Sequence, residues 1–133
     1  MWKKYWFDYI EAFDKSTKVM PDSVVTVYIG RHAIELGLKY LIMVKKGSVV
    51  KSHGLKKLYV YKIQEQYMEW VDSFCELYCK YIEGDNPEYF RFLEYKGNAS
   101  FAVNRLDIRW LCYNLSLIIL KLLHFSGLED EYN

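Results

Sequence analysis

The chain has 133 residues, of which 52% are hydrophobic and 26% are charged, so it is long enough to bury a core and too apolar to be disordered. Its formal net charge of +1 excludes nucleic-acid binding that depends on bulk charge and leaves only a local basic patch to contact phosphates. The odd number of cysteines, three, and the lack of a secretory signal lead us to expect a single cytoplasmic domain over residues 1–133.

The first expected helix covers about Trp2–Lys15. Its apolar side is expected to contain Tyr5, Tyr9, Ala12 and Phe13. The helix should stop before Pro21, because proline disfavours the helical conformation in the residue that precedes it. Either Asp22 or Ser23 is then expected to cap the next helix.

The second helix is expected over roughly Val24–Lys46 and should end at Gly47-Ser48. Its β-branched opening, Val24–Val27, would also suit a strand, but no partner strand is found and the helical period that continues from it decides the assignment. Apolar residues recur along it at steps of three and four, which predicts one buried stripe: Val27, Ile34, Leu38, Leu41 and Ile42.

Two further helical segments follow, Leu55–Gln66 and Tyr67–Glu83. They could form one long helix, because neither glycine nor proline separates them. A break at residues 84–87 then precedes a long connection, Glu88–Val103, which carries the aromatic run Tyr-Phe-Arg-Phe at 89–92. Long loops with large apolar residues often serve a function.

The last helix is expected over Arg105–Phe125, capped by Asn104 and ended by Gly127. The acidic tail that follows, residues 129–131, should be frayed. The apolar stretch Leu115–Phe125 is too short to cross a bilayer, so we expect no membrane association. Together these segments predict an all-α fold, an antiparallel bundle of four to five helices.

Three chemically capable side chains, Arg31, His32 and Glu35, lie within about one turn of the second helix and beside its buried stripe. In a catalytic interpretation, Glu35 orients the imidazole of His32 as an acid or base near neutral pH. In a structural interpretation, Arg31 and Glu35 form an i,i+4 ion pair and His32 anchors a neighbouring helix or loop. The sequence favours the structural interpretation, because polar groups this close to a core need partners.

Lysines cluster around the turn after this helix: Lys45, Lys46, Lys51, Lys56 and Lys57. They could contact phosphates, but the helix macrodipole explains lysines at a helix end equally well. His53 is expected to cap or pack that turn. At about 1.5 Å per residue, the helix places His32 roughly 20 Å from the end at which the turn begins.

Cys75 and Cys79 are four residues apart on an expected helix and could face one metal ion. Two ligands do not make a closed zinc site, and no second Cys or His pair at matching spacing completes it. We therefore expect these thiols to pack in the core, and we expect neither a metal nor a cofactor.

Several segments, Arg31–Ile42, His53–Leu58, Phe90–Phe92 and Asp107–Arg109, resemble the HEPN superfamily, small helical bundles common in prokaryotic conflict systems. The resemblance covers most of the chain from about Val24 to Leu123. It implies an all-α bundle that often dimerises, with the last helix at or near the interface. Many members are metal-independent ribonucleases, including toxins paired with antitoxins and abortive-infection proteins.

The ribonuclease signature of that family is an arginine followed by a histidine after four to six intervening residues, usually on the last long helix. The histidine would act on the ribose 2′-hydroxyl and the arginine would stabilise the phosphate. Here Asn114 stands at the expected place after Arg109, and asparagine cannot act as a general base at neutral pH. The resemblance therefore implies either that the nuclease chemistry is lost or that Arg31, His32 and Glu35 host it.

The leading hypothesis is a homodimeric, non-catalytic module of an RNA-linked stress or anti-phage system, which binds RNA or a partner such as an antitoxin protein. The candidate binding residues are Arg91, His53, Lys56 and Lys57. The abundance of aromatic residues, 13 Tyr, 7 Phe and 4 Trp, favours an interface, although these side chains could instead fill gaps between helices.

The competing hypothesis is an active, metal-independent endoribonuclease that uses Arg31, His32 and Glu35, with Arg91 folded over them. A third hypothesis, a small-ligand sensor that uses the core of the bundle, has no specific support in the sequence.

Overall fold

The computed structural model describes residues 2–47, 51 and 105–132, and within these residues every regular element is an α-helix. The elements are α1 (Trp2–Val19), α2 (Val24–Lys46), α5 (Arg105–Ser126) and the short α6 (Glu129–Tyr132). The all-α class is therefore confirmed for the part of the chain that the structure describes. The predicted helices Leu55–Gln66 and Tyr67–Glu83 and the connection Glu88–Val103 lie outside the described residues, so the predicted number of helices stays a prediction.

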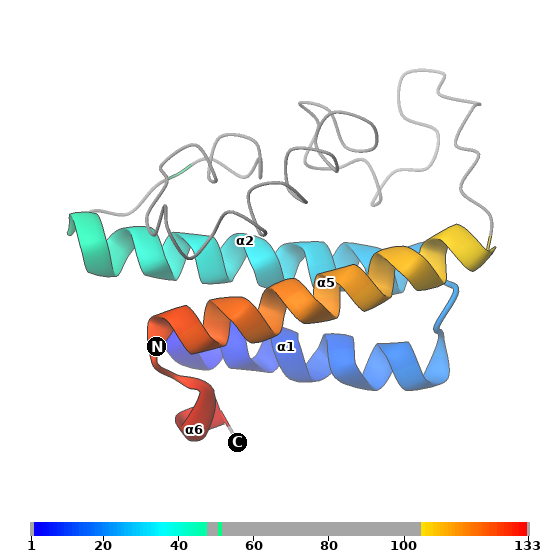
Figure 1. Cartoon of the computed structure of the whole chain (residues 1–133), viewed down its shortest axis with the longest axis horizontal. Helices are drawn as coiled ribbons and strands as arrows, with labels where there is room; N and C mark the ends of the chain where they lie inside the picture. Colours follow the sequence, from blue (N-terminus) through cyan, green and yellow to red (C-terminus); the bar gives the residue numbers. More distant parts are fainter. Residues whose placement is uncertain (1, 48–50, 52–104, 133) are drawn as a thin grey trace.

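Three long helices lie side by side in Figure 1, with α2 and α5 running in one direction and α1 in the other. Helix α2 packs extensively against both α1 and α5, whereas α1 and α5 contact each other less. This central position explains the burial of nearly every residue of α2 from Gly30 to Lys39. The predicted stripe of α2 is confirmed, since all its members are almost fully buried: Val27, Ile34, Leu38, Leu41 and Ile42.

The end of α1 differs from the prediction, because the helix continues past Lys15 to Val19. The Met20 amide donates a hydrogen bond to the Ser16 carbonyl at 2.7 Å, which closes the last turn just before Pro21. Of the two predicted caps of α2, Ser23 is the one observed: its side-chain oxygen accepts a hydrogen bond from the Val25 amide at 3.1 Å. The start and end of α2 match the prediction, and Gly47 ends it with a φ of 74°.

The predicted apolar side of α1 was wrong in two of its four residues, Tyr5 and Ala12, whereas Phe13 is buried and Tyr9 packs against the core. The buried residues are Trp6, Ile10 and Phe13, whereas Tyr5 is 50% exposed, Ala12 is exposed and Tyr9 is half-buried. The physical reason lies on α2, where glycines leave room for large rings of α1. A Cβ on Gly37 would stand 2.7 Å from the Trp6 ring. Trp6 and Phe13 of α1 pack against these glycines, and the face of α1 that carries them is therefore buried.

The acidic tail, which was expected to fray, instead forms α6. Gly127 adopts a φ of 73°, and the Leu128 amide donates to the Leu123 carbonyl at 3.0 Å, which closes the end of α5. Leu128 is buried, and the Tyr132 ring packs edge-on against Phe7 of α1 with the ring centres 5.3 Å apart. These apolar contacts fix the direction of the tail, so its acidic composition was a poor guide to its order.

Among the described residues, one stretch, Ile108–Ser126 of α5, is long and apolar enough to cross a membrane, with a mean hydropathy of 1.3. Core helices of soluble proteins meet the same criterion, and 44% of this stretch is buried inside the structure. The composition of α5 therefore gives only weak support for a membrane span.

Candidate functional site

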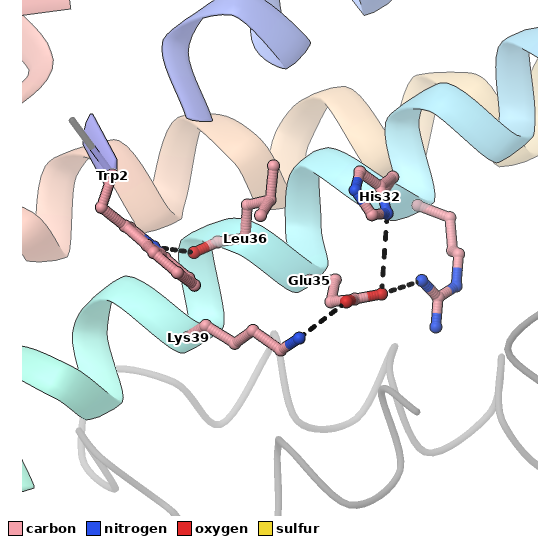
Figure 2. A network of polar contacts seen from close by, with 6 residues as sticks. Trp2, His32, Glu35, Leu36 and Lys39 are labelled. Carbon is pink, nitrogen blue, oxygen red and sulfur yellow. Dashed lines mark hydrogen bonds and ion pairs between the residues drawn. The ribbon is translucent and has the colours of Figure 1, made fainter. Parts of the chain in front are cut away.

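The α2 charged row consists of Arg31, Glu35 and Lys39, which are spaced by four residues and therefore share one face of the helix. The Arg31 guanidinium donates a hydrogen bond to Oε1 of Glu35, and Lys39 Nζ donates to Oε2 at 2.9 Å. The carboxylate of Glu35 thus accepts from both cations, and Figure 2 shows it facing the ammonium group of Lys39. The predicted Arg31–Glu35 pair is thus present, and Lys39 extends it by one turn.

The charged row is buried, with side-chain exposures of 2% for Arg31, 2% for Glu35 and 6% for Lys39. Charges removed from water to this degree require close partners, because desolvation costs several kcal/mol per ion in order-of-magnitude terms. The row supplies such partners from within a single helix. Its geometry suits a structural role, since both oxygens of the carboxylate already accept from a cation.

His32 lies beside this row, and its ring lies close to the rings of Tyr9 and Tyr28. Its Nδ1 is 3.7 Å from Oε1 of Glu35, which is longer than a hydrogen bond. The centre of its ring is 4.5 Å from that of Tyr9 on α1 and 6.1 Å from that of Tyr28 on α2. The side chain is 19% exposed. His32 therefore joins α1 to α2 by ring packing, in agreement with the anchoring role considered for it.

The two residues at the family-motif position, Arg109 and Asn114, lie on α5, on a different helix from the charged row. Arg109 is exposed. The side-chain amide of Asn114 donates a hydrogen bond to the Trp110 carbonyl at 2.9 Å. This local bond to the preceding turn occupies the amide nitrogen and holds the side chain along its own helix.

The other predicted binding residues, Arg91, His53, Lys56 and Lys57, lie outside the described residues, as do Cys75 and Cys79. Of the predicted lysine cluster, Lys46 and Lys51 are exposed. In the part of the chain that the structure describes, no group of three or more His, Cys, Asp and Glu side chains is arranged to hold a metal ion.

One surface feature of α5 was missed by sequence reasoning. Trp110, Tyr113 and Leu120 are 56%, 64% and 61% exposed, and Leu117 between them is partly exposed. We call these four residues the α5 stripe; their spacing of three, four and three residues places them along one side of the helix. The opposite side faces the core through Leu111, Leu115, Ile118 and Leu122. Because α5 is apolar on both sides, its sequence does not reveal which side is exposed.

Helix α5 also carries the thiol of Cys112. Its side chain is buried in the core, and this burial raises the pKa of the thiol from about 9.0 to about 11. A thiol with so high a pKa is a poor nucleophile at neutral pH, so Cys112 contributes to packing.

Comparison with protein-family models, with curated proteins and with solved structures finds no match to this chain. The resemblance to the HEPN superfamily therefore stays a prediction from the sequence.

Proposed function

We propose that this protein is a HEPN-like, non-catalytic interaction module that acts as a homodimer in an RNA-linked stress or anti-phage system. The observation that carries the dimeric part of the proposal is the α5 stripe, an exposed row of large apolar residues on a core helix. The link to RNA and defence comes from the resemblance of the sequence.

The α5 stripe supports association with a second copy for a geometric reason. Steps of three, four and three residues are those of the apolar seam along which two helices pair. Trp110 and Tyr113 at one end and Leu120 at the other are each more than half exposed, so pairing would remove large apolar area from water. A two-fold axis at the middle of the stripe would place Trp110 and Tyr113 of one copy against Leu120 of the other.

The α2 charged row supports the proposal that the protein is not catalytic. A general acid or base must come within hydrogen-bonding distance of its substrate, whereas Glu35 is 1% exposed and each of its oxygens already accepts from a buried cation. At the family-motif position, Asn114 lacks a basic nitrogen, and its amide is bonded to the backbone of its own helix.

The dimer is tested by sedimentation with one variant of the stripe, Tyr113→Glu. Burying the new carboxylate at the seam would be costly, so the variant should sediment as a monomer at concentrations at which the wild type is a dimer. The control is Tyr5→Glu, which places the same change on a half-exposed tyrosine of α1, away from the stripe. A monomeric wild type, or equal dissociation of both variants, would refute the proposal.

The alternative, a metal-independent ribonuclease, has one observation in its favour, the partial exposure of His32 next to Glu35. It is tested by incubating the folded wild-type protein with varied RNAs in EDTA. The proposal predicts no cleavage above background. Cleavage that is lost in His32→Ala and kept in His124→Ala, an exposed histidine of α5, would instead establish a nuclease that uses the relocated site.

A further inference from the structure

A pocket of about 310 Å³ lies where α1, α5 and α6 meet. Its apolar lining comes from Ile10 and Phe13 of α1 and Ile119 and Leu123 of α5, which are buried, and from the exposed Leu120. Pockets of this size with apolar walls and a few polar groups are typical of small-molecule sites.

The polar groups of this pocket are acidic or neutral, and none of its lining residues is basic. Asp14 of α1 and Glu129 of α6 contribute carboxylates, and Ser116 and Tyr132 contribute hydroxyls. Within the described residues, the carboxylate of Asp14 makes no ion pair or hydrogen bond, and Thr17 donates to the backbone carbonyl of Asp14. Glu129 pairs with the exposed imidazole of His124 at 3.0 Å.

The wall formed by α6 is held against α1 by two contacts. Tyr132 packs on Phe7, and Lys3 of α1 forms an ion pair with Glu131 at 2.6 Å. Burial, together with the nearby carboxylates of Asp14 and Glu11, raises the pKa of the Tyr132 phenol, so the hydroxyl keeps its proton at neutral pH. The pocket is thus built from three elements, of which α6 contributes half of the acidic pair.

From this combination we infer that the pocket binds a small amphipathic amine, with its apolar body against Ile10, Ile119 and Leu123 and its ammonium group at Asp14 and Glu129. A neutral apolar molecule would contact the same walls but would place no ammonium group beside the two carboxylates. An anion would be repelled by both carboxylates. The inference does not rest on the proposed dimer or on its link to RNA, but the pocket shares one residue, Leu120, with the α5 stripe.

The test uses octylammonium as the probe and 1-octanol as its neutral counterpart, each titrated into the full-length protein and followed by methyl NMR. The expected result is saturable shifts of the Ile10, Ile119 and Leu123 methyl groups, with octylammonium binding about threefold to tenfold more tightly than octanol. Equal affinities for the two probes would overturn the assignment of charge recognition. Shifts confined to Leu117 and other methyl groups outside the pocket would overturn its location.

Two variants complete the test. Asp14→Asn removes the charge without changing the shape and should weaken octylammonium binding about threefold or more while leaving octanol binding unchanged. The matched control is Asp8→Asn on the same helix, an exposed aspartate that pairs with Lys4 outside the pocket. Ser116→Phe should fill the pocket and abolish binding of both probes. Binding that survives both pocket variants at wild-type strength would refute the inference.

Discussion

Glu35 is the residue that links the α2 charged row, because one of its oxygens accepts from Arg31 and the other from Lys39. Replacing it by glutamine keeps the size of the side chain but removes the negative charge to which both buried cations bond. Removing one partner of a buried ion pair typically lowers the free energy of unfolding by about 3–5 kcal/mol. We expect Glu35→Gln to lower the free energy of unfolding by about this amount, measured by urea denaturation followed by circular dichroism.

A matched control for this prediction lies on α1. Glu11 forms an i,i+4 pair with Lys15 at 3.0 Å, but both side chains are more than half exposed. Such surface pairs contribute about 0.3–0.5 kcal/mol, so Glu11→Gln should change stability by less than about 0.5 kcal/mol. If Glu35→Gln were as mild as Glu11→Gln, the charged row would not be a structural requirement of the fold.

At the scale of single residues, the sequence predicted what depends on spacing within one helix. The Arg31–Glu35 pair follows from a separation of four residues and is present. The ring of Tyr9 against His32 could not be predicted in the same way, because it depends on how α1 packs against α2. The burial of Lys39 could not be predicted from the sequence either, because lysine is almost always exposed in folded proteins.

At the scale of elements, boundaries were predicted best where a local signal sets them. Ser23 and Gly47 delimit α2, and Gly127 ends α5, as their capping preferences indicate. The buried face of α1 was predicted poorly, because its aromatic residues lie all around the helix and the partner decides which of them is buried. The same holds for α6, whose order comes from Leu128 and Tyr132 and from contacts with α1.

The packing of α1 on α2 depends on close approach at Gly37. A Cβ added there would stand 2.7 Å from Cζ2 of Trp6 and 3.1 Å from Cδ1 of Leu122. Alanine is favoured over glycine in a helix by about 1 kcal/mol, but overpacking a core costs about 1–3 kcal/mol. We expect Gly37→Ala to destabilise the protein by about 1–2 kcal/mol, seen as a lower urea midpoint with an unchanged slope.

A double-mutant cycle separates the clash from the intrinsic preference. In a Trp6→Leu background the smaller side chain leaves room for the Cβ, so Gly37→Ala should lose its cost and become neutral or stabilising by up to about 1 kcal/mol. An equal destabilisation in both backgrounds would mean that the contact between Trp6 and Gly37 does not limit the approach of the two helices.

At the scale of the whole molecule, α2 is the centre of the described structure and α5 is its boundary. Helix α2 is covered along most of its length, which is why its apolar stripe and its charged row are both buried. Helix α5 packs through one side and presents the α5 stripe on the other. The proposed dimer and the proposed amine pocket both use α5, on adjacent sides that meet at Leu120.

Burial also shapes how the stability of the whole molecule should depend on pH. Burial raises the pKa of the Cys112 thiol to about 11, and burial is likewise the main cause that raises the pKa of the Tyr9 and Tyr132 phenols. Each of these groups is neutral when protonated. The unfolded chain therefore releases their protons at a lower pH than the folded protein does, beginning near pH 9. Between that pH and about 11, the folded state binds more protons, so stability falls as the pH rises.

We therefore expect the free energy of unfolding to stay nearly constant from pH 7 to about 8.5 and to decrease steadily from pH 9 to 11, measured by urea denaturation at each pH. Cys112→Ala removes one of the linked protons, so its stability should decrease less steeply over that range, whatever the substitution costs at pH 7. Val44→Ala serves as the control, because Val44 is an exposed side chain that carries no titratable group. Parallel pH curves for Cys112→Ala and the wild type would show that the buried thiol titrates as it does in the unfolded chain.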